Sequence, residues 1–159
     1  MKPLRVNLSQ ARRRTLKLEG QLPAAALDLE SLDEMIKLTG PFDYEFTVEW
    51  TGEGLLLSGR LELGIRCVCV RCLNEFEDRV VLEDWQAHAP VLGEEALPVE
   101  EDCLDLLPLI REELALALPQ HPLCDAGCKG LPEEAAYRGD AEEPNDGLDA
   151  WSVLDRLQL

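Results

Sequence analysis

The sequence has few aromatic residues and lacks the long apolar segments of a membrane protein. Aromatic side chains make up 5% of its 159 residues, although hydrophobic residues make up 46%. No apolar run approaches the ~20 residues that a transmembrane helix requires, and the start of the chain lacks the hydrophobic segment of a signal peptide. The sequence therefore predicts a cytoplasmic protein whose core consists mainly of leucine, valine and alanine.

Motifs of the common catalytic sites are also missing. The two histidines, His88 and His121, stand alone in the sequence. There is no glycine-rich phosphate loop, no Ser-His-Asp arrangement and no pair of histidines at metal-binding spacing. We therefore expect a protein that is not an enzyme.

Basic residues are scarce except at the N-terminus. The chain carries 15 lysines and arginines against 32 acidic residues, which gives a net charge of −17. Affinity for nucleic acid depends mostly on lysine and arginine contacts with phosphate, so an acidic body indicates a basic protein partner. A direct contact with RNA would need the N-terminal segment, where the candidate residues are Arg12, Arg13, Arg14 and Lys17. The alternative for the three arginines is a solvated turn.

The strongest structural pattern is a strand over residues 42–50, in which apolar and mostly aromatic side chains alternate with polar ones. A turn at 51–54 and a second alternating segment at 55–65 predict a long antiparallel hairpin. A third strand is expected at 75–89, so that the sequence from Cys69 to Cys72 forms the tip of a further hairpin. Weaker alternation predicts shorter strands at 4–8 and 15–22.

Helical spacing of apolar residues predicts a helix over residues 105–117, with Pro108 tolerated in its first turn. A shorter helix is expected at 32–38, ended by Gly40 and Pro41. We predict an α+β fold for residues 1–131, in which an antiparallel sheet or small barrel is covered by the longer helix. An acidic linker over 132–147 and a short amphipathic helix over 148–159 would complete the chain.

Four of the six cysteines form two closely spaced pairs, Cys69-Val-Arg-Cys72 and Cys124-Asp-Ala-Gly-Cys128. These spacings let both sulfurs of a pair reach one metal ion, and four thiolates hold zinc in a tetrahedron without an open position. In a reducing compartment, paired cysteines favour metal binding over disulfides. We therefore predict a structural zinc site made by Cys69, Cys72, Cys124 and Cys128, which would clasp the hairpin tip to the loop after the helix.

Other interpretations of the cysteines remain open. They could be buried or idle thiols, or the first pair could be a redox switch whose thiol pKa is lowered by Arg71. Cys67, Cys103 or His121 could also replace one of the four ligands. The simpler explanations are that Cys67 is a strand thiol, Cys103 is an isolated thiol and His121 is a structural histidine.

Several motifs in a fixed order resemble the YceD family, the large ribosomal RNA subunit accumulation proteins. The resemblance implies a non-enzymatic factor needed for accumulation of large-subunit ribosomal RNA, with a basic large-subunit ribosomal protein or a pre-ribosomal particle as partner. The chain departs from the family where many relatives have Cys-Pro-x-Cys-Gly after Cys-Lys-Gly-Leu, and where relatives have Asp-Pro-Arg near the end. The motifs are Cys69-Val-Arg-Cys-Leu73 with Phe76, Asp105-Leu-Leu-Pro-Leu-Ile-Arg-Glu-Glu-Leu, His121-Pro-Leu-Cys124 and Cys128-Lys-Gly-Leu131.

Overall fold

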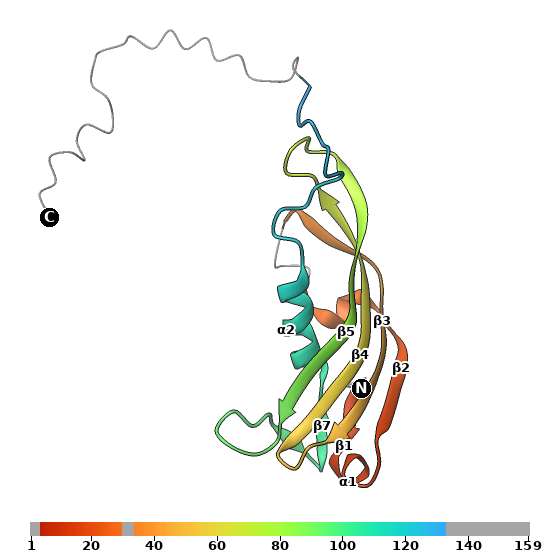
Figure 1. The fold of residues 1–159 in the computed structure, drawn as a ribbon, viewed down its shortest axis with the longest axis vertical. Helices are drawn as coiled ribbons and strands as arrows, with labels where there is room; N and C mark the ends of the chain where they lie inside the picture. The colour runs from red at the N-terminus through yellow and green to blue at the C-terminus, as the bar shows by residue number, and fades with distance from the viewer. Residues whose placement is uncertain (1–3, 30–33, 133–159) are drawn as a thin grey trace, which may run out of the picture.

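A computed structural model describes residues 4–29 and 34–132, which form two antiparallel sheets with short helices (Figure 1). The linker expected at 132–147, apart from Pro132, and the helix expected at 148–159 lie outside the described residues. The larger sheet has the order β2 (Leu16–Leu22), β3 (Ile36–Trp50), β4 (Gly54–Val68) and β5 (Glu75–Pro90). Because β2 and β5 end this order without pairing to each other, the sheet is open, as in the first of the two predicted arrangements, and not a closed barrel.

The long hairpin of β3 and β4 confirms the strongest sequence prediction. Trp50 pairs with Leu55 next to the turn, and the register continues to Phe42 opposite Leu63. Phe42, Phe46 and Val48 are buried, and they face the same side of the sheet as the buried leucines of β4. Alternation at a period of two therefore places one apolar face against the core.

Strand β5 continues the sheet as predicted, with one β-bulge. Gly59 pairs with Trp85, but Leu61 pairs with Leu82, so β5 has one more residue than β4 at this point. The extra residue lets both Trp85 and Leu82 turn toward the core. Trp85 packs edge-on against Phe46, with ring centroids 5.4 Å apart.

The helix predicted at 32–38 is wrong over the part of this range that the structure describes, residues 34–38. Strand β3 begins at Ile36 and pairs with the end of β4 through Leu38 opposite Ile65. The register then shifts between Leu38 and Phe42, so Gly40 and Pro41 lie within an irregularity of the strand and do not end a helix. Glycine and proline are both tolerated at such bulges, which is why the two residues were misleading.

A second, small sheet holds the N-terminal segment against the rest of the chain. Its strands are β1 (Arg5–Asn7), β7 (Cys103–Asp105) and β6 (Val99–Glu100), in that order. The segment predicted as one strand at 4–8 therefore ends in the one-turn helix α1 (Leu8–Ala11), whose first turn is capped by the side chain of Asn7. A short 3-10 helix, η1 (Ala24–Leu27), follows β2.

Helix α2 (Leu107–Ala117) confirms the predicted covering helix, with Pro108 in its first turn. It starts two residues later than expected because the carboxylate of Asp105 accepts the N–H of Leu107 at 3.1 Å. Ile110 and Leu114 are fully buried in the core, and Figure 1 shows α2 lying along one face of the sheet. No helix within residues 4–29 and 34–132 is long and apolar enough to cross a membrane.

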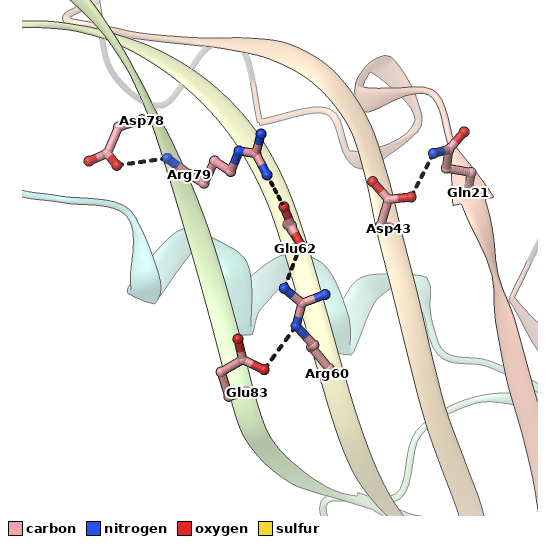
Figure 2. A network of polar contacts seen from close by, with 7 residues as sticks. All are labelled: Gln21, Asp43, Arg60, Glu62, Asp78, Arg79 and Glu83. Carbon is pink, nitrogen blue, oxygen red and sulfur yellow. Dashed lines mark hydrogen bonds and ion pairs between the residues drawn. The ribbon is translucent and has the colours of Figure 1, made fainter.

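The opposite face of the sheet carries a ladder of charged side chains (Figure 2). Glu62 on β4 accepts ion pairs from Arg60 at 2.7 Å and from Arg79 at 2.9 Å. Arg60 also reaches Glu83 on β5 at 2.9 Å. Acidic residues on this face are thus interleaved with arginines, so this face contributes less to the negative field than its number of carboxylates suggests.

Candidate metal centre

The structure brings the two cysteine pairs together at one end of the sheet. The sulfurs of Cys69, Cys72, Cys124 and Cys128 all lie within 4.8 Å of one another. Cys69 is fully buried, whereas Cys124 is exposed. In Figure 1, the turn between β4 and β5 and the segment after α2 meet far from the small sheet.

The first pair sits in a tight turn between β4 and β5. The N–H of Leu73 donates to the carbonyl of Cys69, and the N–H of Cys69 donates to the carbonyl of Asn74, both at 2.9 Å. Leu73 has a φ of 61°, which lets the chain reverse within the turn. This closed loop directs Cys69 and Cys72 toward the same point.

The second pair sits in a turn stiffened by Asp125. The N–H of Cys128 donates to the carbonyl of Asp125 at 3.0 Å, and the Asp125 carboxylate accepts the N–H of Gly127 at 3.3 Å. Gly130 follows with a φ of 87°, and a side chain at this position would approach the carbonyl of Arg71. Glycine therefore suits this position because of its left-handed backbone, whereas the contact itself would be of ordinary length.

Two hydrogen bonds join the turns directly. The N–H of Val70 donates to the carbonyl of Pro122 at 3.0 Å, and the guanidinium of Arg71 donates to the carbonyl of Cys128 at 3.2 Å. Sequence reasoning considered Arg71 only as a charge near a thiol. The sequence gives no sign of the bond between Arg71 and Cys128, because the two residues come from segments far apart in the chain.

Two of the distances between the sulfurs match those of a tetrahedral zinc site. Zinc–sulfur bonds of about 2.3 Å place the corners of a regular tetrahedron about 3.8 Å apart. The sulfurs of Cys69 and Cys128 are 3.8 Å apart, and those of Cys72 and Cys124 are 3.7 Å apart. A disulfide needs a sulfur–sulfur distance near 2.05 Å, and all six cysteines are free thiols.

The backbone around the cluster stabilises negative charge on one sulfur. Hydrogen bonding from the backbone of Cys124, and then from that of Cys72, lowers the pKa of the Cys69 thiol to about 6. Hydrogen bonds with the thiols of Cys128 and Cys72 raise the pKa of Cys124 to about 12. Amides aimed at a sulfur are the outer-shell contacts that a metal-bound thiolate accepts.

The other candidate ligands lie outside this group. Cys67 is buried in β4 between Ile36 and Phe76, and its side chain belongs to the hydrophobic core. Cys103 lies on β7, where its sulfur is 3.9 Å from the Asn7 amide. His121 is exposed. Among the described residues, none of the three joins the four sulfurs in the metal-binding group.

The N-terminal basic residues lie at the other end of the molecule and do not act alike. Arg12 stacks on the Trp50 ring at 4.6 Å. Lys17 is paired with Glu45 at 2.7 Å and with Glu19 at 3.0 Å, and these two carboxylates raise its pKa. Arg13 and Arg14 are exposed, so they are the members of the predicted basic segment left available for an external anion.

Residues 57–158 match the family described as "Large ribosomal RNA subunit accumulation protein YceD", which covers more than half of the chain and both cysteine pairs. The chain belongs to the YceD family. The matched region contains β4 from residue 57 onward together with β5 and α2, so the elements that position the cysteine cluster are part of the sequence shared by YceD proteins.

A curated relative comes from Mycobacterium leprae (strain TN), where it is named an uncharacterized protein. It is 27% identical to this YceD protein over 127 residues, which cover 74% of this chain and 58% of the relative. The chain thus spans less than two thirds of the length of that relative. No solved structure matches this chain.

Proposed function

We propose that this chain is a non-catalytic factor that supports the accumulation of large-subunit ribosomal RNA. The observation that carries the proposal is the family match over residues 57–158, because the family is described by that process. The net charge of −17 supports a basic partner. A large-subunit ribosomal protein, or a pre-ribosomal particle rich in such proteins, has this property.

The charges of the loop between β5 and β6 support a protein partner. Glu94 and Glu95 are exposed there, and Glu101 is exposed in the turn between β6 and β7. No described residue forms an ion pair with these three glutamates. They differ in this respect from Glu62 and Glu83, which are neutralised by arginines on the outer sheet face. The loop therefore concentrates uncompensated negative charge where a basic surface can approach.

A direct RNA contact through the N-terminus receives less support. Lys17 is held by two glutamates, and Arg5, which shares a hollow of about 500 Å³ with Arg14 and Lys17, is paired with Glu100 at 3.7 Å. Each of these carboxylates would oppose a phosphate group. We therefore favour the protein partner over the RNA contact.

The metal in this proposal is zinc in a structural role. Four cysteine sulfurs occupy the whole coordination sphere of a tetrahedral ion, which leaves no position for water or substrate. Bound there, zinc would fasten the β4–β5 turn to the segment after α2. The cluster would thus preserve the shape of the molecule and would not carry out a reaction.

The test is deletion of the gene in the organism that encodes it, with measurement of the ratio of large- to small-subunit ribosomal RNA and of particle profiles. We expect a lower ratio, restored by the wild-type gene and by a Cys103→Ser variant. Unchanged ribosomal RNA and particle levels in the deletion strain would contradict the proposed function. Full loss of rescue by Cys103→Ser, with the protein folded and present, would point to thiol chemistry instead.

A further inference from the structure

A second surface feature is an open apolar groove between η1 and the start of α2. It has a volume of about 420 Å³, which is within the usual range of about 300–1,000 Å³ for binding pockets. Its exposed lining is mostly apolar, and it lies apart from the cysteine cluster. Its apolar lining includes Leu27, Leu29 and Ala115, and charged residues such as Asp28 and Arg111 also line it.

The two walls of the groove are tied together, so that its shape exists before anything binds. The guanidinium of Arg111 on α2 donates to the carbonyl of Asp28 at 2.8 Å and lies 3.5 Å from its carboxylate. Asp28 ends η1 with a φ of 50°. Leu27 and Leu29, on either side of it, are buried and anchor this wall in the core. A preformed apolar groove reduces the entropy that an occupant loses on binding.

The C-terminal segment of the chain itself has the chemistry to fill this groove. Trp151, Leu154 and Leu157 recur at intervals of three residues, which places them within about 120° on one side of an α-helix, with Leu148 at the edge of this side. The fifteen residues before this segment, 133–147, are rich in acidic residues, glycine and proline and carry few large apolar side chains. The apolar content therefore returns only at the end of the chain.

We propose that residues 148–159 dock as a short helix in the groove between η1 and α2, with Trp151 as the main anchor. The family match runs over residues 57–158 and includes the α2 wall and the segment up to its last residue, whereas the η1 wall precedes the matched region. The docking does not depend on the proposed ribosomal function. It makes the C-terminus part of the fold and leaves the acidic linker 133–147 as a loop anchored at both ends.

The chain between Pro132 and the segment is long enough for this return. A flexible linker of 15 residues spans roughly 20 Å on average, and about 50 Å when fully extended. Helix α2 is about 16 Å long at 1.5 Å per residue. The segment 118–132 that follows α2 runs on toward the cysteine cluster (Figure 1), and the linker has the same number of residues, so it is long enough to return to the end of α2 near Ala115.

Hydrogen exchange of the full-length chain tests the contact. In the wild type, amides of 148–159 should exchange about tenfold or more slowly than in an unstructured chain, while those of 133–147 exchange freely. Ala115→Glu places a charge in the groove and should abolish the protection. The matched control is Leu116→Glu at the next helix position, where the side chain is 82% exposed and does not line the groove; it should retain the protection.

A second variant covers the case in which Ala115→Glu fails to fold. Trp151→Glu changes only the C-terminal segment and should release 148–159 without changing the exchange of β3 and β4. Replacing Trp151 with a photoreactive benzoylphenylalanine should give a crosslink to 26–29 or 105–115 within the same chain.

Each other outcome overturns the proposal. Unprotected amides in 148–159 of the wild type would mean that the segment does not dock. If Leu116→Glu abolished the protection of residues 148–159 as Ala115→Glu does, the segment would dock on the outer face of α2 and not in the groove. A crosslink near Val70 and Leu73 would place the segment at the cysteine cluster, and protection that grows with protein concentration would assign the groove to a second copy.

Discussion

Val70 and Pro122 join the two halves of the cysteine cluster through their backbones. The N–H of Val70, in the β4–β5 turn, donates to the carbonyl of Pro122, which precedes the second cysteine pair, at 3.0 Å. Arg71 adds its bond to Cys128 next to it. These bonds align the two turns and thereby help to bring the four sulfurs together, in addition to what a bound ion would contribute.

This arrangement predicts that the chain purified without added metal contains about one zinc ion, held by four sulfurs. Cys72→Ser and Cys124→Ser should each lower the zinc content well below one ion per chain, because a hydroxyl is a poor zinc ligand. Elemental analysis by mass spectrometry measures the content. Cys103→Ser is the matched control and should bind as much zinc as the wild type, since its sulfur lies on β7. Zinc-free wild-type protein, or equal loss in the control, would contradict the four-cysteine site.

A second prediction concerns Gly59 on β4, where strand β3 approaches closely. A Cβ atom added here would collide with the carbonyl oxygen of Glu45 and with the backbone of Phe46. Since backbone cannot move aside cheaply, Gly59→Ala should lower the free energy of unfolding by about 2–3 kcal/mol. Chemical denaturation at neutral pH measures this change.

Gly64 provides the matched control on the same strand. Its nearest neighbour would be the backbone nitrogen of Gly40 at 3.4 Å, which is an ordinary contact. Gly64→Ala should therefore change the stability by no more than about 1 kcal/mol, and a slight gain is expected because glycine weakens a strand interior. Equal destabilisation by both variants would show that the close approach at Gly59 is not the cause.

The third prediction concerns Asp102, which ties the turn between β6 and β7 to α1. Its carboxylate accepts the N–H of Ser9 at 3.1 Å. Hydrogen bonds from the Ser9 side chain and backbone lower the pKa of Asp102, and the charge of Arg12 adds to this effect. The charged form is therefore favoured in the folded state, so its contribution is present above the unfolded pKa, near 3.9, and is lost as the pH falls through the folded pKa.

Asp102→Asn should consequently lower the melting temperature at pH 7 and have progressively less effect as the pH is lowered below about 4. Asparagine tolerates the left-handed backbone that Asp102 adopts with a φ of 59°, so the variant changes the charge without adding strain. Glu101→Gln removes a neighbouring charge and should leave the melting temperature nearly unchanged. A difference between Asp102→Asn and wild type that is constant with pH would exclude the charged hydrogen bond as its source.

The sequence predicted the elements whose pattern is local. Alternation over 42–50 and 55–65 was sufficient for the β3–β4 hairpin, and the apolar spacing of Ile110 and Leu114 was sufficient for α2. The segment 32–38 failed because a stretch of seven residues fits either period, and only pairing with β4 decides between them. Tertiary pairing outweighed the local signal from Gly40 and Pro41.

The cysteine cluster shows the same division between local and distant information. Spacing within each pair indicated which sulfurs could share an ion, and the structure places these four together. The bonds from Val70 and Arg71 to the second turn join positions more than fifty residues apart, as with Arg71 and Cys128, and no sequence period encodes them. The groove between η1 and α2 also depends on the packing of distant segments and could not be expected from either element alone.

The last prediction concerns the partner. Replacing Glu94, Glu95 and Glu101 with glutamine removes three exposed charges, two from the loop between β5 and β6 and one from the turn that follows β6. Binding of immobilised full-length protein to purified large-subunit ribosomal proteins should weaken and become less dependent on salt, because these charges are not offset by described cations.

The matched control removes the same number of charges from the outer sheet face, through Glu62→Gln, Glu77→Gln and Glu83→Gln. These carboxylates are paired with arginines at 2.7–3.1 Å, so their loss exposes cations and alters the field mainly on that face. Because the net charge is equal in both triple variants, a weaker interaction only in the loop variant would assign the contact to the loop. Equal weakening in both triple variants would indicate nonspecific attraction to the acidic chain. A separate double variant, Arg13→Ser with Arg14→Ser, tests the alternative partner: if it abolishes RNA binding, the N-terminal contact with nucleic acid is favoured.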